Sequence, residues 1–349
     1  MPFYPLIALL CTPENVAQVA ESEWNELIET GRKTQLLGQL AAVLHSHQLM
    51  QQVPVAVQRH LALARLTVMR RNQSALWEID NLRRAISPSI PLVLLKGCAY
   101  LAKGDQNAAG RLFSDIDVLV RHRNLPGVEA DLMAVGWKPS RVNAYDQAYY
   151  RNWMHEVPPM VHVRRHTVVD LHHAINPPVS RFYIDPERFF DRLDEPRPGI
   201  FVLCTDDRVV HCALHVLQEG DPTKVIRDLY DLHSLLQQHH GSPQALDGLR
   251  QRSQALGVLH QVNAAIGAAN TLFSVERDKP VPSGWLQASL VKVASLAFGG
   301  TSLVGEGATL ALLAYAHWIK MPVHILLPHL VHKSRTWLML DRQPRMDAA

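Results

Sequence analysis

Apolar residues recur at helical spacing through most of the first 86 residues. We predict a first helix from Pro13 to Gly31, because the proline can open it, apolar positions follow, and the glycine can end it. A second helix is predicted over residues 34–49, and a much longer third helix begins at Pro54 and closes at Ser87-Pro88. The apolar side of the third helix includes Leu76, Ile79, Leu82 and Ile86.

Between residues 91 and 120 the pattern changes to two short apolar runs, as expected of buried strands. Residues 92–95 form the first run, which ends at Lys96-Gly97. The second run, residues 118–120, follows directly after Asp115 and Asp117. Because strand residues two positions apart share a face, we predict that these aspartates point the same way while Ile116 enters the core.

Further along the chain, helical and strand patterns alternate. A helix is predicted from Leu125 to Gly136, and residues 160–172 predict a β-hairpin in which Asp170 interrupts an apolar second strand. The remaining segments are mainly helical, over residues 208–218, 224–239, 244–271 and, with glycine breaks, 285–330. The prediction is an α+β protein with a small mixed β-sheet between two helical regions. Its three expected parts are an N-terminal helical region (1–86), an α/β core (87–200) and a C-terminal helical region (201–349).

Composition and charge restrict the class of protein further. The 349 residues are 47% hydrophobic and 19% charged, which is typical of a globular chain with more than one subdomain. A net charge of only +3 does not indicate a nucleic-acid partner. The long third helix carries several arginines that could bind RNA or an acceptor, but a solvated helix face explains them better.

The cysteines and the apolar segments near the two ends of the chain indicate where in the cell we expect the protein. The four cysteines form no C-x-x-C pair, so we expect reduced thiols in a cytoplasmic protein: Cys11, Cys98, Cys204 and Cys212. The apolar start of the chain lacks a basic segment and a small-residue cleavage site, so we expect it to pack in the core rather than act as a signal. Trp318 and Lys320, beside apolar helix faces, leave open a contact of the C-terminal helices with a membrane surface, but packing on the body is favoured.

The two aspartates of residues 115–117 are the strongest chemical signal. Carboxylates on one face of a strand are suitable ligands for hard divalent cations, Mg²⁺ above all. Two such ions can bind both the attacking and the leaving oxygen of a phosphoryl transfer. The alternative is structural, because an Asp can also cap a loop through a hydrogen bond.

The order strand, glycine turn, helix and Asp-x-Asp strand resembles the DNA polymerase β-type nucleotidyltransferase superfamily. More narrowly, the residues LLKG, an arginine shortly before DIDVLV, and a helix ending in Gly136-Trp137 resemble a group of largely uncharacterised bacterial nucleotidyltransferases. The superfamily usually has a Gly-Ser pair in the first turn, where this chain has Lys96-Gly97-Cys98.

The resemblance implies transfer of a nucleoside monophosphate from an NTP, with ATP the first choice, to a hydroxyl or phosphate acceptor. Mg²⁺, with Mn²⁺ as the alternative, would be held by Asp115, Asp117 and Asp170, and Asp170 could instead act as general base. The nucleotide would be bound by a second set of residues: Lys96, Gly97, Arg111 and Ser114. The acceptor is left open.

Several alternatives remain at this stage. Arg111 would bind phosphate or pair with a carboxylate, and Asp170 would be catalytic or simply hydrogen-bonded at a strand edge. The helix around Arg227 carries further polar residues, Asp228 and Asp231, which could line the nucleotide pocket or form ion pairs. The altered glycine turn leaves room for a catalytically inactive binding or regulatory module with the same fold.

A metal hydrolase is the third alternative. His211 and His215 lie four residues apart and would share a helix face, but no third ligand has an obvious spacing. His172 and His173 are adjacent, so on a strand they point to opposite faces and cannot form one site together.

Overall fold

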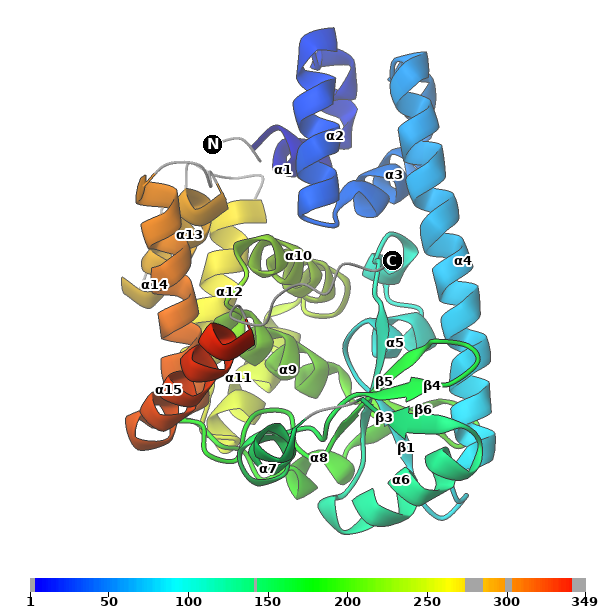
Figure 1. Cartoon of the computed structure of the whole chain (residues 1–349). Coiled ribbons are helices and arrows are strands. Elements are labelled where there is room, and N and C mark those ends of the chain that lie inside the picture. The colour runs from blue at the N-terminus through cyan, green and yellow to red at the C-terminus, as the bar shows by residue number, and fades with distance from the viewer. Residues whose placement is uncertain (1–3, 141–142, 274–284, 299–302, 341–349) are drawn as a thin grey trace, which may run out of the picture.

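A computed structural model shows a seven-stranded mixed sheet surrounded by helices from the N-terminal and C-terminal regions of the chain (Figure 1). It describes residues 4–140, 143–273, 285–298 and 303–340. The predicted α+β class is therefore confirmed. Whether regions 1–86, 87–200 and 201–349 fold as separate domains stays a prediction.

The N-terminal helices differ from the prediction at one point. They are α1 (Tyr4–Cys11), α2 (Trp24–Lys33), α3 (Leu37–Ser46) and α4 (Val55–Ala85). The predicted helix from Pro13 to Gly31 is wrong, because Pro13–Gln18 is a short 3-10 helix and Val19 after it is extended. The 3-10 helix and α2 each bury apolar residues of their own. The spacing of apolar residues alone cannot distinguish two such short elements from one longer helix. The apolar start of the chain forms α1 and is buried, as expected, at Leu6 and Ile7.

The sheet contains the predicted strands and three more. The strands are β1 (Leu92–Leu94), β2 (Asp115–Leu119), β3 (Trp137–Pro139), β4 (Met160–His162), β5 (Val168–His172), β6 (Leu193–Arg197) and β7 (Ile200–Leu203). Their spatial order is β3-β4-β5-β2-β1-β7-β6. Strand β2 is antiparallel to β1 and parallel to β5. Strands β3 and β6 escaped prediction because each contains a proline and has few apolar residues.

Helices connect and cover the strands. Those between strands are α5 (Lys96–Lys103), α6 (Leu125–Ala134), α7 (Ala144–Trp153) and α8 (Glu187–Phe190). Those after the sheet are α9 (Thr205–Gln218), α10 (Pro222–His239), α11 (Pro243–Ala255), α12 (Leu259–Phe273), α13 (Trp285–Phe298), α14 (Leu303–Lys320) and α15 (Val323–Leu340). The segment predicted as one helix over residues 244–271 is thus two helices, α11 and α12, with Gly257 at a φ of 77° between them.

Alternation along β2 and β5 separates an acidic face from an apolar one. Ile116, Val118 and Val169 belong to a core formed with α4 and α6. Asp117 and Asp170 are one position out of phase with these residues and therefore point to the opposite face. That face is the side of the sheet on which residues of β1 and β2 share a core with α9 and α10. The fold thus points the predicted carboxylates toward the helices that follow the sheet.

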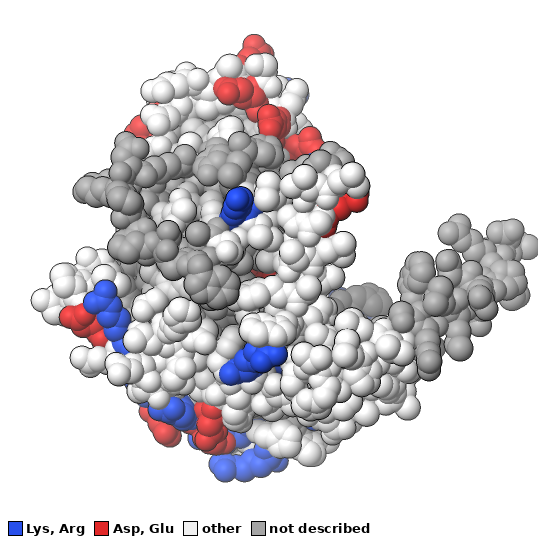
Figure 2. All heavy atoms as spheres, turned by 90° about the vertical axis from the view of Figure 1, so that its left-hand side faces the viewer, with Lys and Arg blue, Asp and Glu red and all other residues white. Residues whose placement is uncertain are grey.

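The C-terminal helices α13, α14 and α15 form one side of the molecule (Figure 1). Figure 2 shows that this side carries few charged side chains. Large apolar residues are exposed on α14 and α15, including Leu310 and Leu327. Within the described ranges, no helix combines the length and the apolar character that crossing a membrane requires. Contact of these helices with a membrane surface, the less favoured alternative from the sequence, remains untested.

Candidate active site

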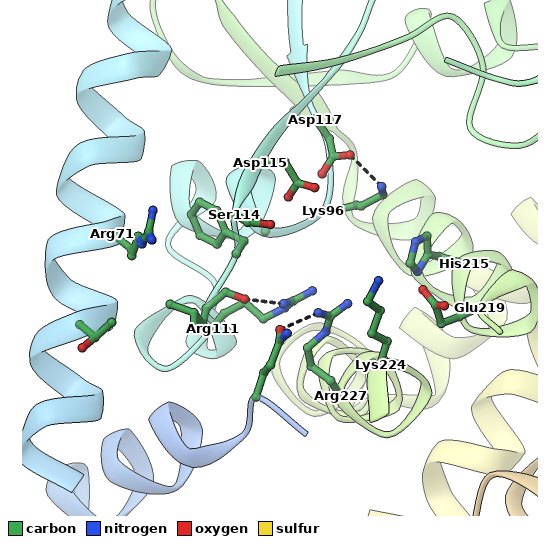
Figure 3. Close-up of a pocket in the computed structure, with 15 residues that line it drawn as sticks. Arg71, Lys96, Arg111, Ser114, Asp115, Asp117, His215, Glu219, Lys224 and Arg227 are labelled. Atoms are coloured by element: carbon green, nitrogen blue, oxygen red, sulfur yellow. Dashed lines mark hydrogen bonds and ion pairs between the residues drawn. The ribbon is translucent and has the colours of Figure 1, made fainter. Parts of the chain in front are cut away.

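A cavity of about 320 Å³ lies between the sheet, α4, α9 and α10. Asp115 and Asp117 reach it from β2, and Lys96 reaches it from the start of α5 (Figure 3). The other charged groups that line it are Arg71, Arg111, Glu219, Lys224 and Arg227. The cavity therefore combines acidic groups suited to metal ions with an excess of cationic groups suited to phosphates.

The three predicted carboxylates lie on one face of the sheet. Asp117 is the direct register partner of Asp170 in the parallel β2–β5 pair, and Asp115 lies two residues before Asp117. The expectation that Asp170 shares a face with the other two therefore agrees with the register, while its catalytic role stays a prediction. The Oδ1 atom of Asp170 is buried and has no hydrogen-bond partner in the described part of the chain.

The charge environment of Asp170 is unfavourable for its ionised form. Burial raises the pKa of Asp170 to about 7, and the nearby carboxylates of Asp117, Glu156 and Asp115 add to this effect, against a smaller opposing contribution from His172. A bound cation would remove this penalty. In this structure the three aspartates do not bring one carboxylate oxygen each to within 4.8 Å of the other two.

Asp117 already has two partners. Its Oδ1 accepts hydrogen bonds from Lys96 Nζ at 2.7 Å and from His172 Nε2 at 2.9 Å. Burial alone would raise the pKa of Asp117, but Lys96 and His172 reverse this and hold the pKa well below its usual range. Lys96, which we expected to contact phosphate, thus serves first as the counter-ion of a predicted metal ligand.

The turn that carries Lys96 is unusual. Lys96 has a φ of 47°, in the left-handed region that favours glycine. It is the first residue of α5, so its amide and those of the next residues have no helical partner and can bind an anion. Gly97 lines the cavity, but a Cβ atom there would lie 2.8 Å from Phe113, so packing also requires the glycine. Its predicted role in phosphate approach remains untested.

Arg111 has the geometry of the ion-pair alternative. Its Nε donates to Asp231 at 2.6 Å, and its Nη2 lies 3.4 Å from Asp228 Oδ1, with both carboxylates buried in α10. Burial would lower the pKa of Arg111, but the two carboxylates raise it above its usual range. The side chain still lines the cavity. Its direct contact with phosphate stays a prediction, as does that of exposed Ser114 on the same wall.

Two cations of the cavity were not singled out from the sequence. Arg71 on α4 and Lys224 on α10 are exposed and have no hydrogen bond or ion pair within the described ranges. Arg71 belongs to the basic series of the long helix, which gave a weak signal, whereas nothing distinguished Lys224. Arg227 differs from both, because it is held by Asp228 and by Gln35 Oε1 at 2.8 Å. Arg71 and Lys224 therefore have no acidic partner to give up when an anion binds.

The sequence disfavoured His211 and His215 as a metal-binding pair, and no metal-ligand group of the described residues contains both. His215 Nδ1 lies 3.0 Å from Asp228 Oδ2 and groups with Glu219, while His211 belongs to neither metal-ligand group of the described residues. A second group does exist and was missed. It consists of His155, Glu156 and His172, which come from two separate parts of the chain.

A mixed sheet with an Asp-x-Asp strand beside a cation-rich cavity agrees with the nucleotidyltransferase class of protein. A family model described as an uncharacterised nucleotidyltransferase matches residues 20–274 of the chain, and the chain belongs to this family. The match confirms the resemblance indicated by the motifs and ends before α13. Neither a curated protein nor a solved structure matches the chain.

Proposed function

We propose that this protein transfers a nucleoside monophosphate from a metal-bound NTP to a hydroxyl or phosphate acceptor and releases pyrophosphate. The observation that carries the proposal is the shared cavity: Asp115 and Asp117 line the same space as five lysine and arginine side chains. Acidic groups alone would indicate only a cation site, and basic groups alone only an anion site. Together they suit a polyphosphate with its metal ion.

The phosphates would be bound by Lys224, Arg71 and the first turn of α5. Lys224 and Arg71 have no acidic partner to lose, so binding a phosphate breaks no ion pair. The amides at Lys96 and Gly97 add hydrogen-bond donors at a helix N-terminus. Arg111 and Arg227 add positive charge from positions fixed by Asp231 and Asp228. ATP is the NTP to be tested first.

The residues present fit a divalent ion. The side chain of Asp115 has no ion pair or hydrogen bond in the part of the chain that the structure describes, and Asp170 Oδ1 is buried without a partner. Asp117 completes the set if Lys96 gives up part of its contact with it. Mg²⁺ or Mn²⁺ held there would neutralise charge on the phosphates and favour attack at the phosphorus.

The chemical step requires a proton acceptor when the nucleophile is a hydroxyl. The acceptor oxygen forms a bond to the α-phosphorus, the bond from that phosphorus to the pyrophosphate oxygen breaks, and the hydroxyl proton must leave. When Asp115 and Asp117 hold the ion, Asp170 is the third carboxylate on the same face of the sheet and suits the role of proton acceptor. A phosphate acceptor would need no such base.

An apolar cavity of about 240 Å³ continues from the cation-rich one and shares Gln35, Thr67 and Leu112 with it. Its other walls include Leu37, Leu63 and Ala64 from the N-terminal helices. The uncharged part of an NTP that presents apolar surface is the aromatic face of its base, and the base lies one ribose away from the phosphates. We therefore assign the nucleobase to this second cavity.

One observation favours a second candidate function. Lys96 occupies the position next to Asp117 where a metal would be expected, and it stands in the altered glycine turn. A protein that keeps this pair closed would bind nucleotides without transferring them, as a binding or regulatory module.

Thermal unfolding with Mg²⁺ and each common NTP, followed by a pyrophosphate-release assay with hydroxyl and phosphate acceptors, separates the two functions. Stabilisation by an NTP together with pyrophosphate release supports transfer. Stabilisation without release, across acceptors of both classes, supports the binding module. The absence of any Mg²⁺-dependent NTP effect contradicts both.

A further inference from the structure

Two histidines and a glutamate meet beside the carboxylates of the sheet. His172 ends β5, while His155 and Glu156 lie between α7 and β4 and reach it through an isolated bridge from Glu156 to His172. His172 Nε2 lies 3.5 Å from Glu156 Oε2, and His155 Nε2 lies 4.0 Å from the same oxygen. One potential ligand atom from each residue lies within 4.8 Å of the other two.

These separations are close to those in a metal site. Ligands about 2.0–2.1 Å from a tetrahedral Zn²⁺ lie roughly 3.3 Å from one another. The distances of 3.5 and 4.0 Å to Glu156 therefore need only a small contraction. Asp117 Oδ1, which lies 2.9 Å from His172 Nε2, is in position to become a further ligand.

The two rings can adopt the protonation state that a metal needs. The side chain of His172 is fully buried and that of His155 is 13% exposed, and the Nδ1 atom of each is buried without a hydrogen-bond partner among the described residues. In the metal-free protein His172 Nε2 donates to Asp117. On metal binding this proton can leave or move to Nδ1, so that Nε2 becomes a ligand.

The charge around the site is mixed, because Glu156 and Asp117 are negative, while Lys96 and Lys320 contribute positive charge from beyond ion-pair distance of Glu156. Glu156 has no lysine or arginine within ion-pair distance in the described part of the chain, and it adds to the negative charge around Asp170. Lys96 is paired with Asp117 instead. A mixed nitrogen and oxygen ligand set selects transition-metal ions such as Zn²⁺ or Co²⁺ rather than Mg²⁺, which prefers oxygen alone.

From this geometry we infer that His155, Glu156 and His172 bind a divalent transition-metal ion, with Asp117 beside it. This site adjoins the Mg²⁺ site of the proposed transfer reaction at Asp117, but His155, Glu156 and His172 do not belong to that site, and the inference does not depend on the transfer function. The ion would tie the segment between α7 and β4 to the end of β5.

The test uses the full chain, treated with a chelator and then titrated with Zn²⁺ by calorimetry and with Co²⁺ by visible absorption, without nucleotide. We expect one equivalent to bind, with the intense absorption bands of tetrahedral Co²⁺. His155→Ala should weaken binding by about tenfold or more. Thermal unfolding of the metal-free variant confirms that it is folded, and Glu156→Gln provides a second variant if it is not.

The matched control is His215→Ala, from the other histidine-containing group, which includes Glu219 and Asp228. Its affinity for Zn²⁺ should equal that of the wild type, and a Mg²⁺ excess should not displace Zn²⁺. Absence of a stoichiometric site, unchanged binding in both His155→Ala and Glu156→Gln, or loss in His215→Ala would overturn the inference. Because no nucleotide is used, each of these results leaves the proposed transfer function to its own test.

Discussion

Replacing Asp170 with asparagine should stabilise the metal-free protein above neutral pH. The carboxyl group is buried among other carboxylates, and its pKa is raised from 3.8 to about 7. At about 1.36 kcal/mol for each pKa unit, this difference corresponds to at most about 4 kcal/mol of folding free energy. Asparagine has nearly the same shape and no charge, so it does not carry this penalty.

The sign of the pH dependence follows from proton binding. Between about pH 4 and 7 the folded wild type keeps the proton on Asp170 that the unfolded chain has lost. The stability contributed by this group is therefore complete at low pH and is lost as the pH rises toward 7. The stability of Asp170→Asn relative to the wild type should rise over the same interval and then stay constant.

Urea unfolding across this pH interval measures the effect, with exposed Asp247→Asn as the control for loss of an aspartate. Adding Mg²⁺ above neutral pH should stabilise the wild type and have a smaller effect on Asp170→Asn. A variant that is destabilised by the same amount at every pH would refute the reasoning, since it would show that Asp170 serves as an ordinary hydrogen-bonding group.

Three further predictions concern the cations and the apolar cavity. Lys96→Ala should weaken NTP binding, more strongly at low salt, yet tighten Mg²⁺ binding because Asp117 loses its counter-ion. Calorimetry with each ligand measures both affinities, and weaker binding of both ligands would contradict the prediction. Arg111→Ala should lower the free energy of unfolding by about 3–5 kcal/mol, because the loss of Arg111 leaves buried Asp231 uncompensated. The control, exposed Arg250→Ala, should cost well under about 1 kcal/mol. Equal losses in urea unfolding would show that the Arg111–Asp231 pair is unimportant for stability. Ala64→Trp should weaken NTP binding but leave tripolyphosphate binding unchanged, since it fills only the apolar cavity; parallel losses would place the base elsewhere.

The site was predictable where it depends on strand periodicity. Asp115 and Asp117 follow the alternation of β2, and Asp170 follows that of β5, so a pattern of two sufficed to place all three on one face. The parallel pairing that puts Asp170 beside Asp117 is a property of the sheet order, and the family resemblance rather than the spacing suggested it. The fold class followed from the same alternation and from the long helical segments.

The partners of the charged groups could not be predicted. Lys96 pairs with Asp117 and Arg111 with Asp231, and each pair joins elements whose packing the sequence does not specify. His172 was discounted because His173 is its neighbour, whereas its actual neighbours in space, His155 and Glu156, come from before β4. Such contacts depend on tertiary packing.

The pairing of Asp117 also decides which aspartate is best suited to a functional test. Asp117→Asn would disturb a buried ion pair and lower stability whether or not the residue binds metal. Asp115 lines the same cavity but has no ion pair or side-chain hydrogen bond within the ranges described, so its replacement should leave folding intact. Loss of function in Asp115→Asn can therefore be attributed to the site.

The most direct measurement is the dissociation constant of ATP, and then of the other NTPs, for the wild type and Asp115→Asn with and without Mg²⁺. The account predicts Mg²⁺-dependent binding to the wild type and a loss of about tenfold or more in the variant, equivalent to about 1.4 kcal/mol or more. Without Mg²⁺ the two proteins should differ little, or the variant should bind slightly better because a negative charge is gone. Equal affinities of both proteins in the presence of Mg²⁺, or no NTP binding by the wild type, would contradict a metal-dependent nucleotide site at Asp115.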